Sequence, residues 1–158
     1  MAVGRARAQS SDRPAPAAEF LVGHAGFLDD TTSAHSVFGA SARVYLTPRL
    51  AVGPEFVYMR GPGSDRDTFL TGNLTFDLLR PRAGRSPRVS PFVVVGGGLF
   101  THSDRFATGT YASSEGAFTA GGGTRVWITN RIYGLVELRV GWEPHYRVTG
   151  GIGVTLSK

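Results

Sequence analysis

The sequence contains no cysteine, and its 17 basic residues include a single lysine, Lys158. Without cysteine the chain can form neither a disulfide nor a thiolate metal site, and cysteine usage says nothing about the redox compartment. The formal net charge of +5 comes from arginines that are scattered along the chain instead of forming a run. Because nucleic acid binding usually needs a basic run or face, we expect no nucleic acid partner.

Long apolar runs are also missing. No stretch approaches the roughly eighteen apolar residues that a transmembrane helix needs. Mean hydropathy is −0.06, a value that strands with one apolar and one polar face would give. If the chain enters a membrane, it must therefore do so as a closed set of strands, which is the other structure that satisfies its backbone in lipid.

The dominant pattern in the sequence is a two-residue alternation of apolar and polar side chains. It is clearest in residues 132–142, where the even positions are apolar and Glu137 and Arg139 occupy odd positions. This period is typical of a β-strand with two different faces. The segments that follow the rule or lie between turn residues are 19–27, 36–46, 50–60, 67–79, 89–102, 115–129, 132–142 and 145–157.

These segments predict one all-β domain over residues 18–158, an eight-stranded antiparallel up-and-down transmembrane β-barrel. Residues 1–17 are rich in Arg, Pro, Ala and Ser, and we expect them to be disordered. Within them, residues 6–8 before Gln9 are similar to the end of a secretory signal whose apolar part is absent. The segment is therefore interpreted as a possible signal peptide remnant.

Alternation alone does not decide which face of the barrel is turned to water. In a soluble barrel the apolar parity fills a dry core, whereas in an outer-membrane barrel it faces lipid and the polar parity fills the lumen. Aromatic residues near strand ends on the apolar parity (Tyr58, Trp142, Tyr146) favour the membrane barrel, as do charges in mid-strand. The alternative is a soluble or periplasmic barrel that binds a small apolar ligand.

If the apolar parity faces lipid, the other parity brings seven charged residues into the lumen. They are Arg43, Glu55, Asp77, Arg125, Glu137, Arg139 and Arg147. An unpaired buried charge is costly, so a narrow lumen must pair them. We expect a salt-bridged plug instead of a wide pore, with Glu137 and Arg139 adjacent on one face of their strand.

Several segments carry weaker expectations. Residues 89–102 are so apolar that their parity is ambiguous, residues 103–114 are predicted to form a polar loop, and Pro54 should mark a bulge or a weak pairing. An even strand number places both termini at one end of the barrel. The connections near Pro48, Arg85 and Asn130 would share this periplasmic end, and those around Asp30, Gly63, residues 103–114 and Pro144 would face outside.

No catalytic, metal or cofactor site is expected. His102, Ser103 and Asp104 hold the residue types of a hydrolase triad, but adjacent residues of one strand do not converge on one another. A lipid-modifying barrel enzyme is accordingly the least favoured alternative. The acidic pairs at 29–30 and 65–67 lack the ligand count of a calcium loop. The triple glycines at 96–98 and 121–123 are interpreted as places where strands curve or pass close to lumen side chains.

The chain resembles the small outer-membrane β-barrel proteins of Gram-negative bacteria, the group that includes the OmpA transmembrane domain, OmpX and OmpW. The residues that carry this resemblance are the turn phrases at 46–51 and 128–132, the strand at 90–98 and the closing strand at 148–156. The resemblance implies a monomer in the outer membrane with a structural or surface-interaction role. Its partners would be the lipid bilayer, lipopolysaccharide and the outer-membrane assembly machinery. That machinery commonly reads a terminal aromatic residue, whereas this sequence ends in Leu156, Ser157 and Lys158.

Overall fold

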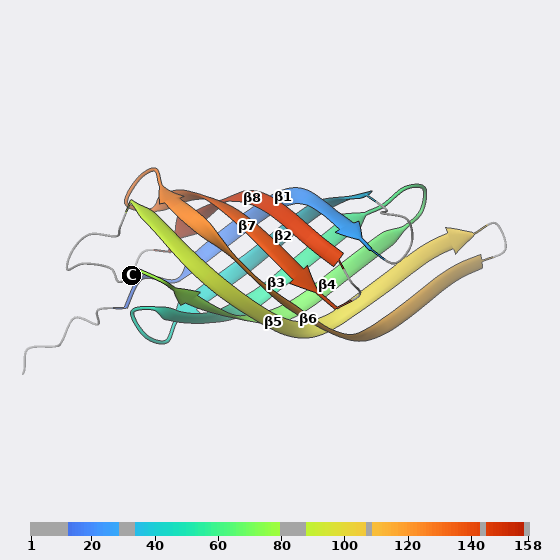
Figure 1. The fold of residues 1–158 in the computed structure, drawn as a ribbon, viewed down its shortest axis with the longest axis horizontal. Helices are drawn as coiled ribbons and strands as arrows, with labels where there is room; N and C mark the ends of the chain where they lie inside the picture. Colours follow the sequence, from blue (N-terminus) through green and yellow to red (C-terminus); the bar gives the residue numbers. More distant parts are fainter. Residues whose placement is uncertain (1–12, 29–33, 80–87, 107–108, 143–144, 157–158) are drawn as a thin grey trace, which may run out of the picture.

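The predicted barrel is confirmed. The computed structural model describes residues 13–28, 34–79, 88–106, 109–142 and 145–156. Each strand pairs antiparallel with the next, and β8 pairs with β1 to close the sheet (Figure 1). The strands are β1 (Ala17–Phe27), β2 (Ala34–Tyr45), β3 (Leu50–Arg60), β4 (Arg66–Asp77), β5 (Val89–Phe106), β6 (Gly109–Trp127), β7 (Ile132–Gly141) and β8 (His145–Thr155). Among the described residues, no helix is long and apolar enough to cross a membrane.

Two tight turns close one end of the barrel with the same hydrogen bonds. The Thr47 hydroxyl accepts hydrogen bonds from the amides of Arg49 and Leu50 at 3.3 and 2.9 Å. In the turn between β6 and β7, the Thr129 hydroxyl accepts hydrogen bonds from the amides of Arg131 and Ile132 at 3.2 and 3.0 Å. A threonine hydroxyl therefore satisfies the backbone donors of both turns, which explains the repeated turn phrases.

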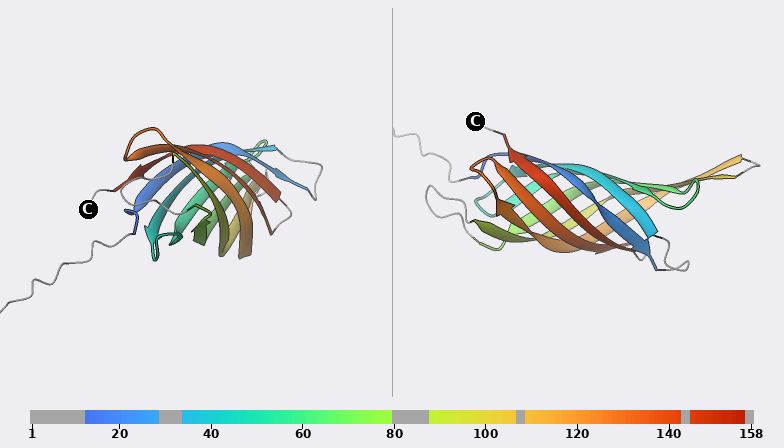
Figure 2. Two further views of the ribbon diagram at one scale, coloured as in Figure 1. Left: turned by 60° about the vertical axis from the view of Figure 1, so that its left-hand side comes forward. Right: turned by 90° about the horizontal axis from the view of Figure 1, so that it is seen from above.

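The first and last described residues lie at this same end of the barrel, which we call the turn end. The opposite end, where β3 connects to β4 and β5 to β6, is the loop end. The amide of Leu156 donates to the carbonyl of Pro16 at 2.7 Å, just beyond the paired ends of β1 and β8. Figure 2 shows the two ends from further directions. Residues 1–12 and the connections near Asp30, Arg85 and Pro144 lie outside the described residues.

The outer surface of the barrel is apolar. Val136 and Ile152 are each 61% exposed, whereas the inward-facing Leu21 is 2% exposed. We call this outer surface the apolar belt. It includes Phe20, Val22, Phe38, Val44, Phe56, Leu70, Leu74, Phe76, Val93, Val95, Leu99, Phe118, Val126, Val136, Leu138, Val140, Val148, Ile152 and Val154. A soluble barrel would turn these apolar side chains into its core, so their exposure is the opposite of what the soluble alternative requires.

The long strands β5 and β6 correct one prediction. Residues 103–114 were expected to form a polar loop, but β5 continues to Phe106 and β6 begins at Gly109, with Ser103 paired to Ala112. Their hairpin projects beyond the rest of the barrel (Figures 1 and 2). The prediction failed because backbone pairing continues past the apolar belt, where both faces of the hairpin are free to be polar.

The structure also resolves the parity of β5 and the role of Pro54. Phe92 and Val94 are buried inside the barrel, while Val93 and Val95 are exposed on the belt. At Pro54 the β2–β3 pairing is interrupted, but the register is the same on both sides of the gap. Proline therefore weakens the ladder locally without inserting a bulge.

In the triple glycine of β5, two neighbouring residues have different surroundings. A Cβ atom added at Gly98, which faces the lumen, would overlap the carbonyl oxygen of Leu70 and lie 2.7 Å from the Cα of Thr71. A Cβ at the neighbouring Gly97, on the outer face, would meet nothing nearer than a backbone oxygen at 3.9 Å. Of Gly97 and Gly98, only the inward-facing Gly98 is required by close approach of a neighbouring strand.

This difference predicts opposite outcomes for adjacent substitutions. Gly98→Ala should destabilise the barrel by about 1–3 kcal/mol or prevent it from folding, because the added methyl group forces two strands apart. Gly97→Ala is the matched control and should fold like the parent protein. The folded fraction of each variant can be measured from the mobility of unboiled samples on a gel. Equal folding of the two variants would contradict this account.

Candidate functional site

Inside the barrel, charged side chains form two layers, of which the first lies nearer the turn end. Arg43 donates to Glu19 at 2.7 Å, and Arg125 donates to Asp77 at 2.6 Å. Arg125 also lies 3.5 Å from Glu19, so the four charges form one connected group. We call it the turn-side quartet. The hydroxyl of Tyr133 donates to Glu19 at 2.7 Å and accepts from Arg43 at 2.9 Å.

The second layer, the loop-side quartet, is centred on Glu55. Its two oxygens accept hydrogen bonds from Arg139 and Arg147, each at 2.8 Å. Arg139 also donates to Glu137 at 2.6 Å, and Arg147 lies 3.5 Å from the same carboxylate. Arg139 further donates to the side-chain oxygen of Asn73 at 3.1 Å.

Each quartet contains two carboxylates and two guanidinium groups, so each has a net charge of zero. Arg139 and Arg147 are directly opposite one another on β7 and β8. Like charges in this position repel, and Glu55, which reaches them from β3, offsets that repulsion. The lumen is therefore held together by contacts that cross it as well as by the backbone ladder.

The seven charged residues that the sequence assigns to the lumen are all buried, and all belong to these two quartets. Sequence reasoning did not include Glu19 and Tyr133 in the network. The alternation around Glu19 carried a usable signal, because Phe20 and Val22 fix the outward parity of β1. Tyr133 carried the same kind of signal, because it shares the odd, inward parity of Glu137 and Arg139 in residues 132–142.

Little space remains between the quartets. They enclose a cavity of about 20 Å³ whose lining includes Glu19, Arg43, Asn73 and Arg139. A polar cavity of this size has room for one water molecule. On the loop side of the charged layers, the lumen is filled by a buried apolar cluster that includes Val57, Met59, Phe69 and Phe100.

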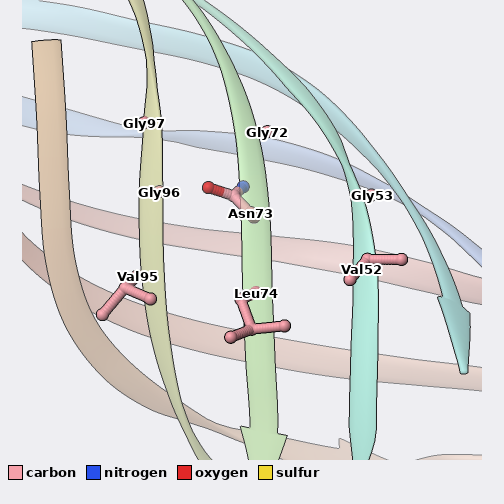
Figure 3. A pocket seen from close by; sticks show the side chains of 8 residues that line it. All are labelled: Val52, Gly53, Gly72, Asn73, Leu74, Val95, Gly96 and Gly97. Carbon is pink, nitrogen blue, oxygen red and sulfur yellow. The ribbon is translucent and has the colours of Figure 1, made fainter. Parts of the chain in front are cut away.

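A shallow groove lies on the outer face of β3, β4 and β5 (Figure 3). Its volume is about 450 Å³, and its lining includes Val52, Leu74 and Val95 together with glycines. Pro54, Gly72 and Gly97 are paired in one row across these strands. Because none of the three carries a long side chain, the belt is thin here and a hydrocarbon chain has room to lie against the backbone.

The residues of the considered triad do not form a catalytic group. His102 and Asp104 face the lumen side of β5, and Ser103 faces the opposite side. His102 donates to Asp67 at 2.7 Å, while the hydroxyl of Ser64 donates to Asp104. These residues lie beyond the apolar belt. Partial burial lowers the pKa of His102, but the hydrogen bond to Asp67 and the surrounding acids outweigh this effect and raise that pKa above its ordinary value.

Solved structures share this barrel. Neisserial surface protein A superposes with a TM-score of 0.78 at 10% identity, covering 89% of this chain and 97% of that one. The chain has the fold of the small outer-membrane β-barrels. The N-terminal barrel domain of Pseudomonas aeruginosa OprF gives a TM-score of 0.68 at 11% identity, covering 89% of this chain and 97% of that one. Ail, the attachment invasion locus protein of Yersinia pestis, gives a TM-score of 0.58 at 11% identity, covering 90% of this chain and 97% of that one.

No protein-family model matches the chain, and no curated protein matches it. The fold and the apolar belt together nonetheless indicate the environment of the barrel. A continuous exposed surface of this kind is the face that transmembrane barrels turn to lipid.

The loop-side quartet predicts a large effect for one substitution. Glu55→Gln should destabilise the barrel by about 3–5 kcal/mol, because Arg139 and Arg147 would lose the carboxylate that offsets their repulsion. The measurement is guanidinium-induced unfolding in lipid vesicles, followed by tryptophan fluorescence. The control is Glu115→Gln, which removes an exposed carboxylate from β6. An unfolding midpoint equal to that of the control would contradict the assigned role of Glu55.

Proposed function

We propose that the protein is an outer-membrane β-barrel of a Gram-negative bacterium with a structural and surface-contact role, a lumen closed to solutes and no catalytic activity. The observation that carries this proposal is the inverted polarity of the barrel. Its exterior is apolar, while its interior holds the two quartets, each with a net charge of zero, on either side of a cavity of about 20 Å³. Such an interior supports the barrel and offers no wide path for diffusion.

The loop end is the surface that this proposal turns to the outside of the cell. It carries the projecting β5–β6 hairpin, whose Tyr111 is 58% exposed, whereas the two connections described at the turn end are tight turns. Short periplasmic turns and longer outer connections are usual in such barrels. Among the similar structures, one is named as a surface protein and another for attachment and invasion.

We also propose lipopolysaccharide as a direct partner at the loop-end border of the belt. Arg60 and Arg66 are exposed and directly opposite one another on β3 and β4, two pairs beyond Tyr58 and Thr68. Neither arginine forms an ion pair with a described residue, unlike the paired arginines of the lumen. A phosphate placed between two guanidinium groups would offset their repulsion and accept hydrogen bonds from both.

The membrane and closed-lumen proposals are tested together by refolding the protein into detergent micelles and lipid vesicles. Unboiled samples should migrate differently from boiled ones, and β-structure should form with detergent but not in plain buffer. Vesicles that contain the barrel should not swell in a small saccharide, whereas vesicles with a wide porin should. A monodisperse, β-rich protein in plain buffer would contradict the membrane assignment, and saccharide-driven swelling would contradict the closed lumen.

The lipopolysaccharide proposal is tested with phosphorylated and dephosphorylated lipid A in detergent micelles. Phosphorylated lipid A should raise the unfolding temperature of the parent protein and of Arg131→Ser, which alters an exposed arginine at the turn end. The double variant Arg60→Ser, Arg66→Ser should lose most of that increase, because it lacks both guanidinium groups. If the double variant gains as much stability as the parent, the arginine pair is not the binding site.

A further inference from the structure

At the loop end, the fold brings together one histidine and two carboxylates from distant parts of the sequence. The Nε2 atom of His35, at the start of β2, lies 2.8 Å from Oδ2 of Asp65 and 3.3 Å from Oδ2 of Asp67. One ligand atom from each of these three residues lies within 4.8 Å of the other two. Thirty residues separate His35 from Asp65, so this group is visible only in the folded barrel.

The spacing of these three atoms is close to that of ligands around a metal ion. Nitrogen and oxygen ligands that bind Zn²⁺ at about 2.0–2.2 Å in a tetrahedron are about 3.3 Å apart. The distance from His35 Nε2 to Asp67 Oδ2 equals that value at 3.3 Å, and the distance to Asp65 Oδ2 is shorter at 2.8 Å. Because the three ligand atoms lie within 4.8 Å of one another, modest side-chain shifts would place them around one ion.

Two further observations indicate that the group is prepared for a ligand. The Oδ1 atom of Asp65 is buried and accepts no hydrogen bond, an unfavourable state for a carboxylate oxygen that a cation would relieve. A side chain at Gly61 would lie 2.8 Å from the Asp65 carboxyl carbon and would also overlap Nε2 of His35. Glycine at this position leaves the space beside both ligands empty.

His102 orients one of these carboxylates from the other side. Its Nδ1 atom donates to Oδ1 of Asp67 at 2.7 Å, which leaves Oδ2 of Asp67 directed toward His35. Hydrogen bonds from outer groups to ligating carboxylates are a regular feature of metal sites. The Asp65 and His102 side chains are 22% and 34% exposed, so an ion has access from solvent, whereas His35 is 2% exposed.

We propose that His35, Asp65 and Asp67 form a binding site for a divalent transition-metal ion of the Zn²⁺ class, with His102 as a positioning residue for Asp67. One imidazole and two carboxylates suit this class of ion, and a fourth position remains for water or an external ligand. The ion joins β2, β4 with the residue that precedes it and, through His102, the β5–β6 hairpin. This inference concerns the loop end and goes beyond the proposed role of the barrel.

The test uses the untagged protein in detergent micelles, first treated with a chelator and then titrated with Co²⁺ and Zn²⁺. We expect one Co²⁺ per barrel, with visible absorption bands of a low-coordinate site that Zn²⁺ abolishes by displacement. His35→Gln keeps an amide nitrogen near the Nε2 position but removes the imidazole ligand. It should fold normally and lose more than about 100-fold in affinity, beyond the 10–100-fold that outer-shell changes cost.

His102 requires a separate comparison, because its proposed role is indirect. His102→Leu should weaken binding by about 10–100-fold and leave the Co²⁺ spectrum of the saturated protein unchanged in form. His102→Asn, which places an amide donor at the Nδ1 position, should recover part of the affinity. The control is His24→Gln, which alters an exposed histidine outside the cluster and should not affect binding.

Two results would overturn the proposal. One is the absence of stoichiometric binding by the parent protein while its unboiled gel mobility shows a folded barrel, which would leave a hydrogen-bonded cluster only. The other is equal metal affinity in the parent and in folded His35→Gln, which would place any bound ion elsewhere.

Discussion

The structure depends on the need to neutralise charge inside a lumen that is only wide enough for side chains. Arg139 and Arg147 stand directly opposite one another on adjacent strands, an arrangement that is unfavourable unless a carboxylate reaches both. Glu55 supplies that carboxylate from the far wall. Because a small slip of β3 along the barrel would move Glu55 away from both arginines, the charge pairing and the register of the closed sheet support each other.

The inward glycines allow adjacent strands and their lumen side chains to lie close together. A Cβ at Gly121 would overlap the carbonyl oxygen of Leu138 on the adjacent strand and lie 2.9 Å from Cγ of Arg139. Likewise, a Cβ at Gly123 would lie 2.9 Å from the ring of Phe92, the ring over which Arg125 is placed at 3.9 Å. Glycine inside the barrel therefore permits close approach of adjacent strands and leaves room beside Arg139 and Phe92, although it weakens a strand by itself.

Alternation in the sequence was sufficient to predict the barrel and the inward face of most strands, because the period of two is imposed by strand geometry. It was insufficient for β5, where Phe92 and Val93 are equally apolar, and for the β5–β6 hairpin, where pairing continues beyond the belt. The partners of each charge were not predictable either. Which acid meets Arg125 depends on the stagger between strands, and Asp77 is 48 residues away in the sequence.

The loop-end cluster follows a different chemistry from the two quartets. In the quartets every base is an arginine, whose guanidinium keeps its charge and therefore gives permanent neutral pairs inside the membrane. Beyond the belt, histidine takes that place beside Asp65 and Asp67. An imidazole nitrogen and a carboxylate oxygen can bind a transition-metal ion, whereas a guanidinium group has no free lone pair for one. The Asp65 and His102 side chains are partly exposed in this layer, so an ion can reach it from solution.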